Sequence, residues 1–564
     1  MKTWRMKISL RTKEGPIELD EIGIERGIFQ GDSFSPLLFC IALAPLSRIL
    51  KRAKTGFKLK NKTVSHLLYM DDLKVYTKNR EEMLRCIDLI KKFSDDIKMD
   101  FGLEKCAVLH IEKGKVTHLP FESEIPELGP EETYKYLGIS ESSDIMHDEM
   151  KKKAKSEYIS RVRAILKSKL TANNTAQALN GYAMPIMRYG FGILKWTKTE
   201  LVRLDRKIRK LLTEHGFHHP KSNTHRLYAN RQDGGRGICG TYDCYQQECS
   251  SVAKYLETAA TEDHLTKLVK DLEDSKPPTI AITRFNSPSL FTDPKETSKK
   301  HVAEYTKMEM HGQWRRDRDA IATIDIGKSD QWLKQSGIHS ETESLICAAQ
   351  EQALATNYVR NKLWKQSVSS KCRLCKVKEE TVSHLVSGCT MLAGTKYSNR
   401  HDRIGTYLHW CILKELNINV CDDWYKHIPK SSVECGDITV MWDFTLTTEK
   451  RIPANRPDIT IHDRKNRKAT LIDVSVPIDN NIVKKTAEKH VKYRDLEIEI
   501  QKCWGLKEIK TVPIVIGALG SVLTGHTEYL KSICKTAKFN VIQKIALLGT
   551  ANILRSVLGT KNIN

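Results

Sequence analysis

Two adjacent carboxylates, Asp71 and Asp72, stand in the middle of an apolar run over residues 66–76. The run is short, aromatic and β-rich, which predicts a hairpin buried on one face. Two negative charges at a hairpin tip repel each other, and neither can pair with its neighbour. Since Mg²⁺ binds carboxylate oxygens, a divalent cation would explain both side chains. For the bare dipeptide, an exposed Asp-Asp turn is the alternative.

A second carboxylate pair, Asp458 and Asp473, lies in two strand-like segments joined by a polar turn over residues 463–468. If the turn centres on Lys465 and Asn466, the two aspartates face each other across a hairpin. Opposed carboxylates destabilise a hairpin unless a cation neutralises them. Paired acids that hold Mg²⁺ for phosphodiester hydrolysis are typical of PD-(D/E)xK nucleases. A slipped turn would separate the pair.

Three cysteines and a histidine follow a C-x2-C-x8-H-x4-C pattern: Cys372, Cys375, His384 and Cys389. Thiolates and an imidazole at these separations suit tetrahedral Zn²⁺, and a site with four protein ligands is structural. The first two cysteines alone would also suit a redox pair. With the histidine and third cysteine added, zinc is the better interpretation.

The chain has 564 residues and a net charge of +23, which predicts several domains and a polyanionic partner such as nucleic acid. A merely soluble basic surface is the alternative. Fifteen scattered cysteines indicate a reducing compartment. The apolar stretch from Val512 is too short to span a bilayer, and the N-terminus lacks a secretory h-region, so we expect no membrane partner.

Several elements should position these groups. Before the first aspartates, Gly27 and Gly31 allow close backbone approach, Ser33 or Ser35 can cap a helix, and Pro36 suits its first turn. A helix near residues 80–99 should bury Leu84, Ile87, Phe93 and either Ile90 or Leu89. A basic helix over residues 199–212 should bury Leu201, Leu204, Ile208 and Leu211 and expose Arg203, Arg206, Lys207 and Lys210. Its charged face is either simply solvent-exposed or binds nucleic acid.

The motifs and their order resemble the second half of a reverse transcriptase palm. Motif B corresponds to Gln30-Gly31-Asp32, motif C to Tyr69 through Asp72, motif D to Lys105, and the primer grip to Tyr136-Leu137-Gly138. The residues within these motifs are similar to those of non-LTR (type-1) retrotransposons that insert into ribosomal RNA genes. The later segments resemble the thumb block (residues 226–237, with Asn230 where the family usually has proline), the CCHC element and the restriction-like endonuclease of that group.

The resemblance implies an α+β multidomain fold: a partial palm (1–140), a helical thumb (141–265), a linker region (266–370, helical and polar from about residue 300), a CCHC zinc knuckle (371–412), a PD-(D/E)xK-like α/β endonuclease (420–530) and a C-terminal helix (531–564). It implies catalytic roles for Asp71, Asp72, Lys105, Asp458, Asp473 and Lys492, with Lys489 in reserve, because no lysine follows Asp473 closely. Mg²⁺ would bind at the two aspartate pairs and Zn²⁺ at the cysteine–histidine cluster. Gln30, Gly31, Arg206, Arg209 and Lys210 would contact substrate.

The implied function is target-primed reverse transcription in the nucleus, with an RNA template and target DNA as partners. The family's motif A aspartate lies in an earlier strand, and no aspartate precedes Asp20. We therefore expect this chain alone not to polymerise; a truncated insertion and a truncated gene model explain that equally well. The alternatives are a nuclease without polymerase, or a non-catalytic nucleic-acid-binding remnant.

Overall fold

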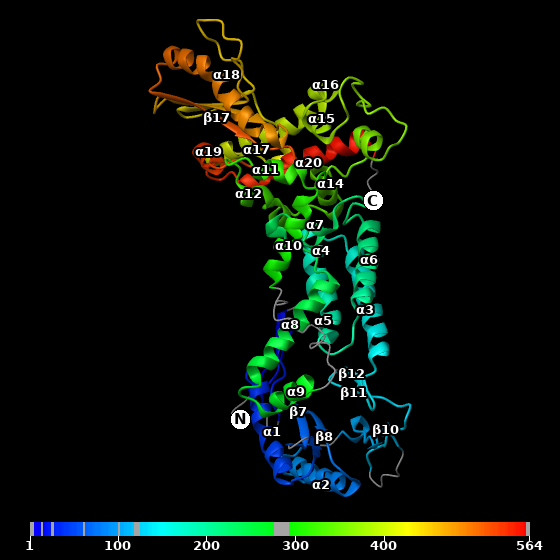
Figure 1. Ribbon diagram of the computed structural model, residues 1–564. Helices are drawn as coiled ribbons and strands as arrows, with labels where there is room; N and C mark the ends of the chain where they lie inside the picture. The colour runs from blue at the N-terminus through cyan, green and yellow to red at the C-terminus, as the bar shows by residue number, and fades with distance from the viewer. Residues whose placement is uncertain are drawn as a thin grey trace. The chain divides into compact units, whose positions relative to one another are not determined.

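The structure, a computed structural model, describes residues 5–12, 15–23, 27–59, 62–99, 102–117, 124–275 and 293–559. The chain forms two compact units, Met1–Met150 and Lys151–Asn564. Figure 1 labels their helices and strands. The division falls close to the end of the predicted palm segment at residue 140.

The described residues of the first unit form two helices and six two-stranded sheets. The helices are α1 (Ser35–Arg52) and α2 (Arg80–Asp96). The strand pairs are β1 (Arg5–Met6) with β4 (Ile22–Gly23), β2 (Ser9–Thr12) with β3 (Gly15–Glu18), β5 (Phe57–Leu59) with β6 (Lys62–Val64), β7 (His66–Tyr69) with β8 (Asp72–Val75), β9 (Ile111–Glu112) with β10 (Lys115–Val116), and β11 (Tyr134–Tyr136) with β12 (Ile139–Glu141). The core of the unit joins both helices to the β7–β8 hairpin through Leu46, Leu50, Ile90, Leu68 and Val75.

Two local predictions for this unit were wrong in detail. In α2 the buried side chains are Cys86, Ile90 and Phe93, whereas Leu84 is exposed, because the helix turns its Cys86 side toward α1. Neither serine caps α1: the N-cap is Phe34, and the Ser35 hydroxyl donates instead to Asp32 at 3.3 Å. Proline at the start of α1 is confirmed.

The second unit begins with a long helical region. Its helices are α3 (His147–Lys167, which starts in the first unit), α4 (Ala172–Ala178), α5 (Met184–Phe191), α6 (Lys198–Glu214), α7 (Thr224–Tyr228), α8 (Thr241–Ala259), α9 (His264–Ser275), α10 (Pro294–Lys307), α11 (Gln313–Asp319), α12 (Ile326–Asp330), α13 (Trp332–Gln335) and α14 (Ser340–Gln350). A capping box between Thr197 and Glu200 starts α6. The predicted buried and exposed faces of α6 are confirmed.

Residues 266–370 were predicted as a linker region that is helical and polar from about residue 300. Residues 293–356 are mostly helical, as expected, and they also pack into a core. Trp332 and Ile346 share a core with Cys372, Leu385 and Leu547. Polar composition suggested a linker, yet many of these polar groups are buried and paired. Arg315, Arg318 and Asp330 form one such network, and Glu343 pairs with Arg231 and Arg236 in another. Residues 276–292, the most proline-rich part of the prediction, lie outside the described residues.

A five-stranded sheet forms the centre of the C-terminal part, in the order β13 (Ser432–Cys435), β14 (Ile438–Trp442), β15 (Ile459–Asp463), β16 (Lys468–Ser475) and β17 (Glu508–Val515). All neighbours are antiparallel except β16 and β17, which α18 (Ile482–Cys503) connects in parallel. Alternate residues of β16 face opposite layers. Ala469 and Leu471 pack toward α18, whereas Ile472 and Val474 pack toward α17 (Ser398–Glu415) and α20 (Phe539–Leu558).

The remaining helices are α15 (Val382–Ser387), α16 (Thr390–Leu392) and α19 (His526–Ile533). Short 3-10 or π-helical turns cover Leu103–Lys105, Leu179–Ala183, Arg231–Asp233, Val359–Leu363, Ala393–Tyr397, Trp424–Lys426 and Asp479–Asn481. Of the described helices, α20 alone is long and apolar enough to cross a bilayer by composition. Its Ala546 packs beneath the sheet and its Leu547 against α14, so it is a core helix of this unit.

Candidate metal centres and nucleic-acid surface

The predicted aspartate hairpin is confirmed as β7 and β8, with Tyr69 paired to Asp72. Met70 takes a left-handed φ of 52° in the turn, and Asp71 follows it. Both aspartates are exposed, whereas Leu68 and Leu73 anchor the strands in the core. The hairpin therefore presents two carboxylates to solvent from a fixed base.

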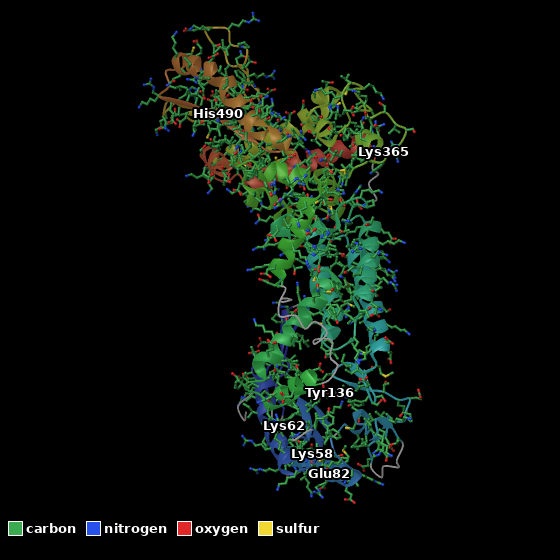
Figure 2. The ribbon with its side chains drawn as sticks, in the orientation of Figure 1. Lys58, Lys62, Glu82, Tyr136, Lys365 and His490 are labelled. Carbon is green, nitrogen blue, oxygen red and sulfur yellow. The ribbon has the colours of Figure 1, made fainter. Side chains whose placement is uncertain are left out.

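The segment predicted as the primer grip lies beside this hairpin. An ion pair between Lys74 of β8 and Glu141 of β12 joins the two strand pairs. The Lys74 ammonium also lies 5.2 Å from the centre of the Tyr136 ring. Figure 2 labels Tyr136. Burial raises the pKa of Tyr136, and the charge of Asp72 adds to the effect. The structure thus brings Asp72 and Tyr136, predicted from separate motifs, into one neighbourhood.

The other predicted palm residues, Lys105, Gln30 and Gly31, make no hydrogen bond to the aspartates among the described residues. Lys105 is exposed, and its carbonyl accepts a hydrogen bond from the Tyr134 hydroxyl at 2.8 Å, which fixes its backbone beside β11. Gln30 and Gly31 are exposed in the loop before α1, where Gly31 has a φ of 95°. Among the described residues, neither makes a hydrogen bond to the hairpin.

The basic face of α6 carries the predicted thumb residues. Arg206 and Lys210 are exposed, and Lys210 lies 3.8 Å from Glu214 in a solvated pair. Arg209 is partly buried and donates to the Tyr228 hydroxyl at 2.7 Å, so its guanidinium is already engaged. The exposed cations are therefore the better candidates for phosphate contacts.

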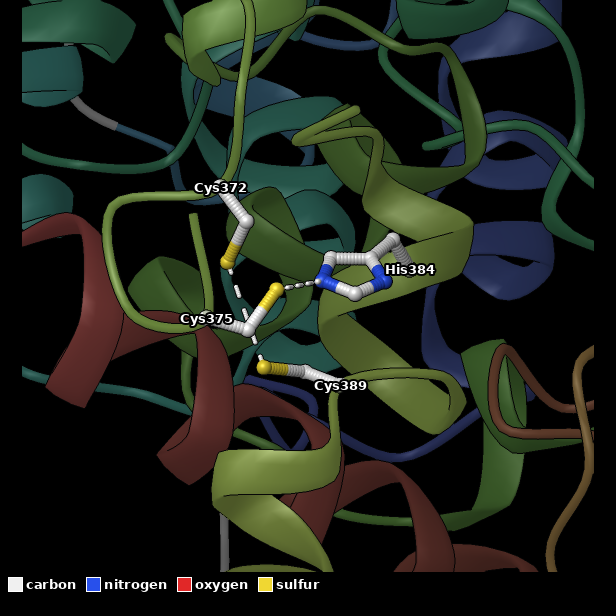
Figure 3. Close-up of side chains that lie close together, drawn as sticks. All are labelled: Cys372, Cys375, His384 and Cys389. Atoms are coloured by element: carbon white, nitrogen blue, oxygen red, sulfur yellow. Dashed lines mark hydrogen bonds between the residues drawn. The ribbon is translucent and has the colours of Figure 1, made fainter. Parts of the chain in front are cut away.

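The cysteine–histidine cluster forms a compact site (Figure 3). The ligand atoms of Cys372, Cys375, His384 and Cys389 all lie within 4.8 Å of one another. The sulfurs of Cys372 and Cys389 are 3.9 Å apart, and Cys375 Sγ lies 3.4 Å from His384 Nε2. All but Cys375 are buried. A convergent set of three thiols and one imidazole fits tetrahedral zinc.

Backbone groups support these ligands. The N–H groups of Lys378 and Val377 lower the pKa of the Cys375 thiol to about 7. Thr381 caps the short helix that carries His384. The Tyr397 hydroxyl accepts from the Cys389 N–H at 3.0 Å and donates to the Leu385 carbonyl at 2.8 Å. The site is thus held by its own turn, a capped helix and a tyrosine.

The predicted register of the second aspartate hairpin is confirmed. Ile459 pairs with Ile472 and Asp463 with Lys468, so Asp458 and Asp473 meet one position beyond the paired residues of β15. In the same way Asp443 follows β14 beside Asp458, and its N–H donates to the Asp458 carbonyl at 2.8 Å. Three aspartates therefore line one end of three neighbouring strands.

Asp473 is 2% exposed and is contacted by three side chains of α18. Lys489 Nζ lies 2.5 Å from Oδ2, Lys492 Nζ lies 3.3 Å from Oδ1, and the Tyr493 hydroxyl donates to Oδ1 at 2.6 Å. The spacing i, i+3, i+4 places all three on one helix face. Both candidate lysines thus reach the same carboxylate.

The pKa of the Tyr493 hydroxyl is affected by all three aspartates. Burial raises the pKa of its hydroxyl, and the charges of Asp473, Asp458 and Asp443 raise it further. Sequence reasoning overlooked Tyr493, although it adjoins Lys492 on an amphipathic helix. It also overlooked Asp443, because the long connection between β14 and β15 does not fix their register in the sequence.

Asp458 is held by groups outside α18. Its Oδ2 accepts from the Val474 N–H at 2.6 Å and lies 3.0 Å from His401 Nε2, at the start of α17. Burial opposes the charged imidazole, but hydrogen bonds and charges from Asp458 and Asp402 outweigh it and raise the pKa of His401 to about 9. Sequence reasoning missed His401, whose only local signal is the adjacent Asp402.

Comparison with known proteins places residues 2–140 in the family described as reverse transcriptase (RNA-dependent DNA polymerase). The chain is 34% identical over 125 residues to the retrovirus-related Pol polyprotein from type-1 retrotransposable element R2 of Nasonia vitripennis. It is 31% identical over 124 residues to the corresponding polyprotein from type-2 retrotransposable element R2DM of Drosophila melanogaster. Each match covers 20% of this chain and 12% of the relative. Residues 2–140 thus match a reverse transcriptase, an RNA-directed DNA polymerase.

Proposed function

We propose that this chain belongs to a non-LTR retrotransposon Pol protein and combines a reverse transcriptase segment with a metal-dependent DNA nuclease. The nuclease nicks one strand of target DNA, and the released 3′-hydroxyl primes copying of the RNA template. The observation that carries the nuclease half is the meeting of Asp458 and Asp473 at one sheet end, beneath Lys489 and Lys492. The family match of residues 2–140 supports the polymerase half.

The nuclease residues have distinct tasks. Asp458 and Asp473 would hold Mg²⁺, which when bound activates water and stabilises charge on the phosphate. Tyr493 fixes one oxygen of Asp473 through its hydrogen bond. The side chain of Lys492 is 42% exposed, so it can leave Asp473 and donate to a phosphate oxygen, while the less exposed Lys489 keeps the buried carboxylate neutralised. Phosphodiester hydrolysis of this kind cleaves one P–O bond, and the nick must leave the 3′-hydroxyl that priming needs.

The other sites supply positioning. Zinc at Cys372, Cys375, His384 and Cys389 would stabilise the fold around it, since four protein ligands leave no open position for chemistry. The exposed cations of α6 would contact the backbone of the template–primer duplex. Asp71 and Asp72 would supply part of a Mg²⁺ site for nucleotide transfer, which this chain alone does not complete. Lys105 would assist that step, and Gln30 and Gly31 would contact the substrate.

A nicking assay tests the proposal. Purified chain is incubated with supercoiled plasmid that carries ribosomal genes, with Mg²⁺, beside an Asp458→Ala/Asp473→Ala variant. Asp437→Ala is the matched control, because Asp437 is exposed in the turn at the opposite end of β14. We expect nicking by the wild type and the control but not by the double variant. Equal nicking by all three would refute the site, and a zinc-loaded wild type that does not nick would favour a binding remnant.

A further inference from the structure

The Asp458 carboxylate is fixed by two groups that come from different layers of the fold. The Val474 N–H of the neighbouring strand donates to Oδ2 at 2.6 Å, and His401 Nε2 lies 3.0 Å from the same atom. Among the hydrogen bonds of the described residues, both that reach this side chain end on Oδ2. A carboxylate has a second oxygen with its own lone pairs. Oδ1 is thus the atom left for a cation.

The His401 ring is itself held firmly. Its Nδ1 lies 3.0 Å from Asp402 Oδ1, so both ring nitrogens face a carboxylate. Carboxylates only accept hydrogen bonds, so Nε2 donates to Asp458 and has no lone pair free for a metal. The preceding residue, Arg400, donates to Thr550 Oγ1 at 2.8 Å and to the Val476 carbonyl at 3.1 Å. These contacts fix the start of α17, and with it the histidine, against the sheet.

We propose that His401 is a positioning residue of the nuclease, whose Nε2–H holds Asp458 Oδ2 so that Oδ1 faces the divalent cation. The inference rests on the proposed function and deepens it, because it names a support for the metal site that lies outside the aspartate–lysine set. Groups that hydrogen-bond to metal ligands set ligand orientation, and their loss typically weakens metal affinity about 10- to 100-fold.

The test measures cation binding directly, on the full zinc-loaded chain with Mn²⁺ as the probe followed by electron paramagnetic resonance. The relevant ion is the one that Asp458→Ala removes. His401→Phe keeps a ring but has no donor, whereas His401→Gln keeps an N–H near the position of Nε2. The matched control is His264→Gln, an exposed histidine in α9.

We expect His401→Phe to weaken binding of that ion roughly 10- to 100-fold, with His401→Gln and His264→Gln close to wild type. Nicking by His401→Phe should recover at saturating Mn²⁺, since the variant changes cation affinity and leaves the reacting groups in place. Thermal melting of each variant confirms that it is folded.

Three results would overturn the inference: wild-type Mn²⁺ affinity in His401→Phe, a His401→Gln variant as weak as His401→Phe, or a wild-type chain without any Asp458-dependent ion. Failure of the nuclease proposal would give a result that differs from these three. A wild type that binds the Asp458-dependent ion but does not nick would refute the nuclease, and the ranking of the His401 variants would still decide the positioning role.

Discussion

Replacing Glu343 with glutamine should open the contact between α14 and the thumb segment over residues 226–237. Glu343 is 1% exposed. It pairs with Arg236 Nε at 2.6 Å through one oxygen and with Arg231 through the other. Arg231 also donates to the carbonyls of Leu333 and Arg236. Glutamine would leave two buried guanidinium charges without an anion, which typically costs about 3–5 kcal/mol.

Amide hydrogen exchange measures that loss locally. A free energy of about 3–5 kcal/mol corresponds to exchange roughly 10² to 5 × 10³ times faster in α14 and in residues 226–237. The matched control is Glu341→Gln in the first turn of the same helix, where the side chain is partly exposed and about 0–1 kcal/mol is expected. Unchanged exchange in Glu343→Gln would show that these ion pairs do not hold α14 against residues 226–237.

The other sites lead to four further predictions. Chelation of zinc should unfold the core around Cys372 and Cys389, because structural zinc contributes on the order of 10 kcal/mol; an unchanged melting temperature after verified metal loss would contradict the site. Burial, together with the charge of Arg236, lowers the pKa of His218 from 6.5 to about 3. Because the unfolded chain takes up this proton below pH 6.5 and the folded chain does not, folding stability is full above pH 6.5 and falls as the pH drops toward 3. At pH 5 the loss is about 2 kcal/mol, and His218→Gln should remove that part of the decline in urea midpoint. Arg206→Ala/Lys210→Ala should weaken binding of an RNA–DNA duplex and reduce the salt slope by about one for each phosphate that is no longer neutralised, whereas the charge-preserving Arg206→Lys should keep it. Primer extension by the pure chain should fail, because among the described residues Asp71 and Asp72 join no third metal-binding side chain; processive cDNA synthesis would refute this.

Periodicity accounts for most of what the sequence predicted correctly. The 3.6-residue repeat of α6 identified its buried leucines because the opposite face is almost wholly charged. The β15–β16 register followed from one turn, since a period of two leaves few choices once the turn is centred. The cysteine–histidine cluster is local, spanning eighteen residues, so its spacing alone brought the ligands together.

The failures share a cause as well. In α2 several apolar residues compete for one face, and only packing against α1 selects Cys86 over Leu84. The core packing of residues 293–356 was not predicted, because Arg315, Arg318 and Glu343 look like surface residues until their partners are known. A charged side chain can be buried only if it has a partner elsewhere in the chain, and the composition of a segment does not reveal that partner.

The same reasoning explains why only part of the proposed nuclease site could be predicted from the sequence. Asp458 and Asp473 belong to one hairpin and could be paired by counting, whereas His401 lies 57 residues before Asp458 and reaches it only because α17 packs on the sheet. Asp473 is likewise neutralised by lysines of the next helix rather than of its own strand. A single hairpin therefore defines which carboxylates oppose each other, but the layers on its two sides decide which oxygen each one offers to a cation. Variants of the flanking layers therefore complement variants of the aspartates in distinguishing a working metal site from two acids that face each other.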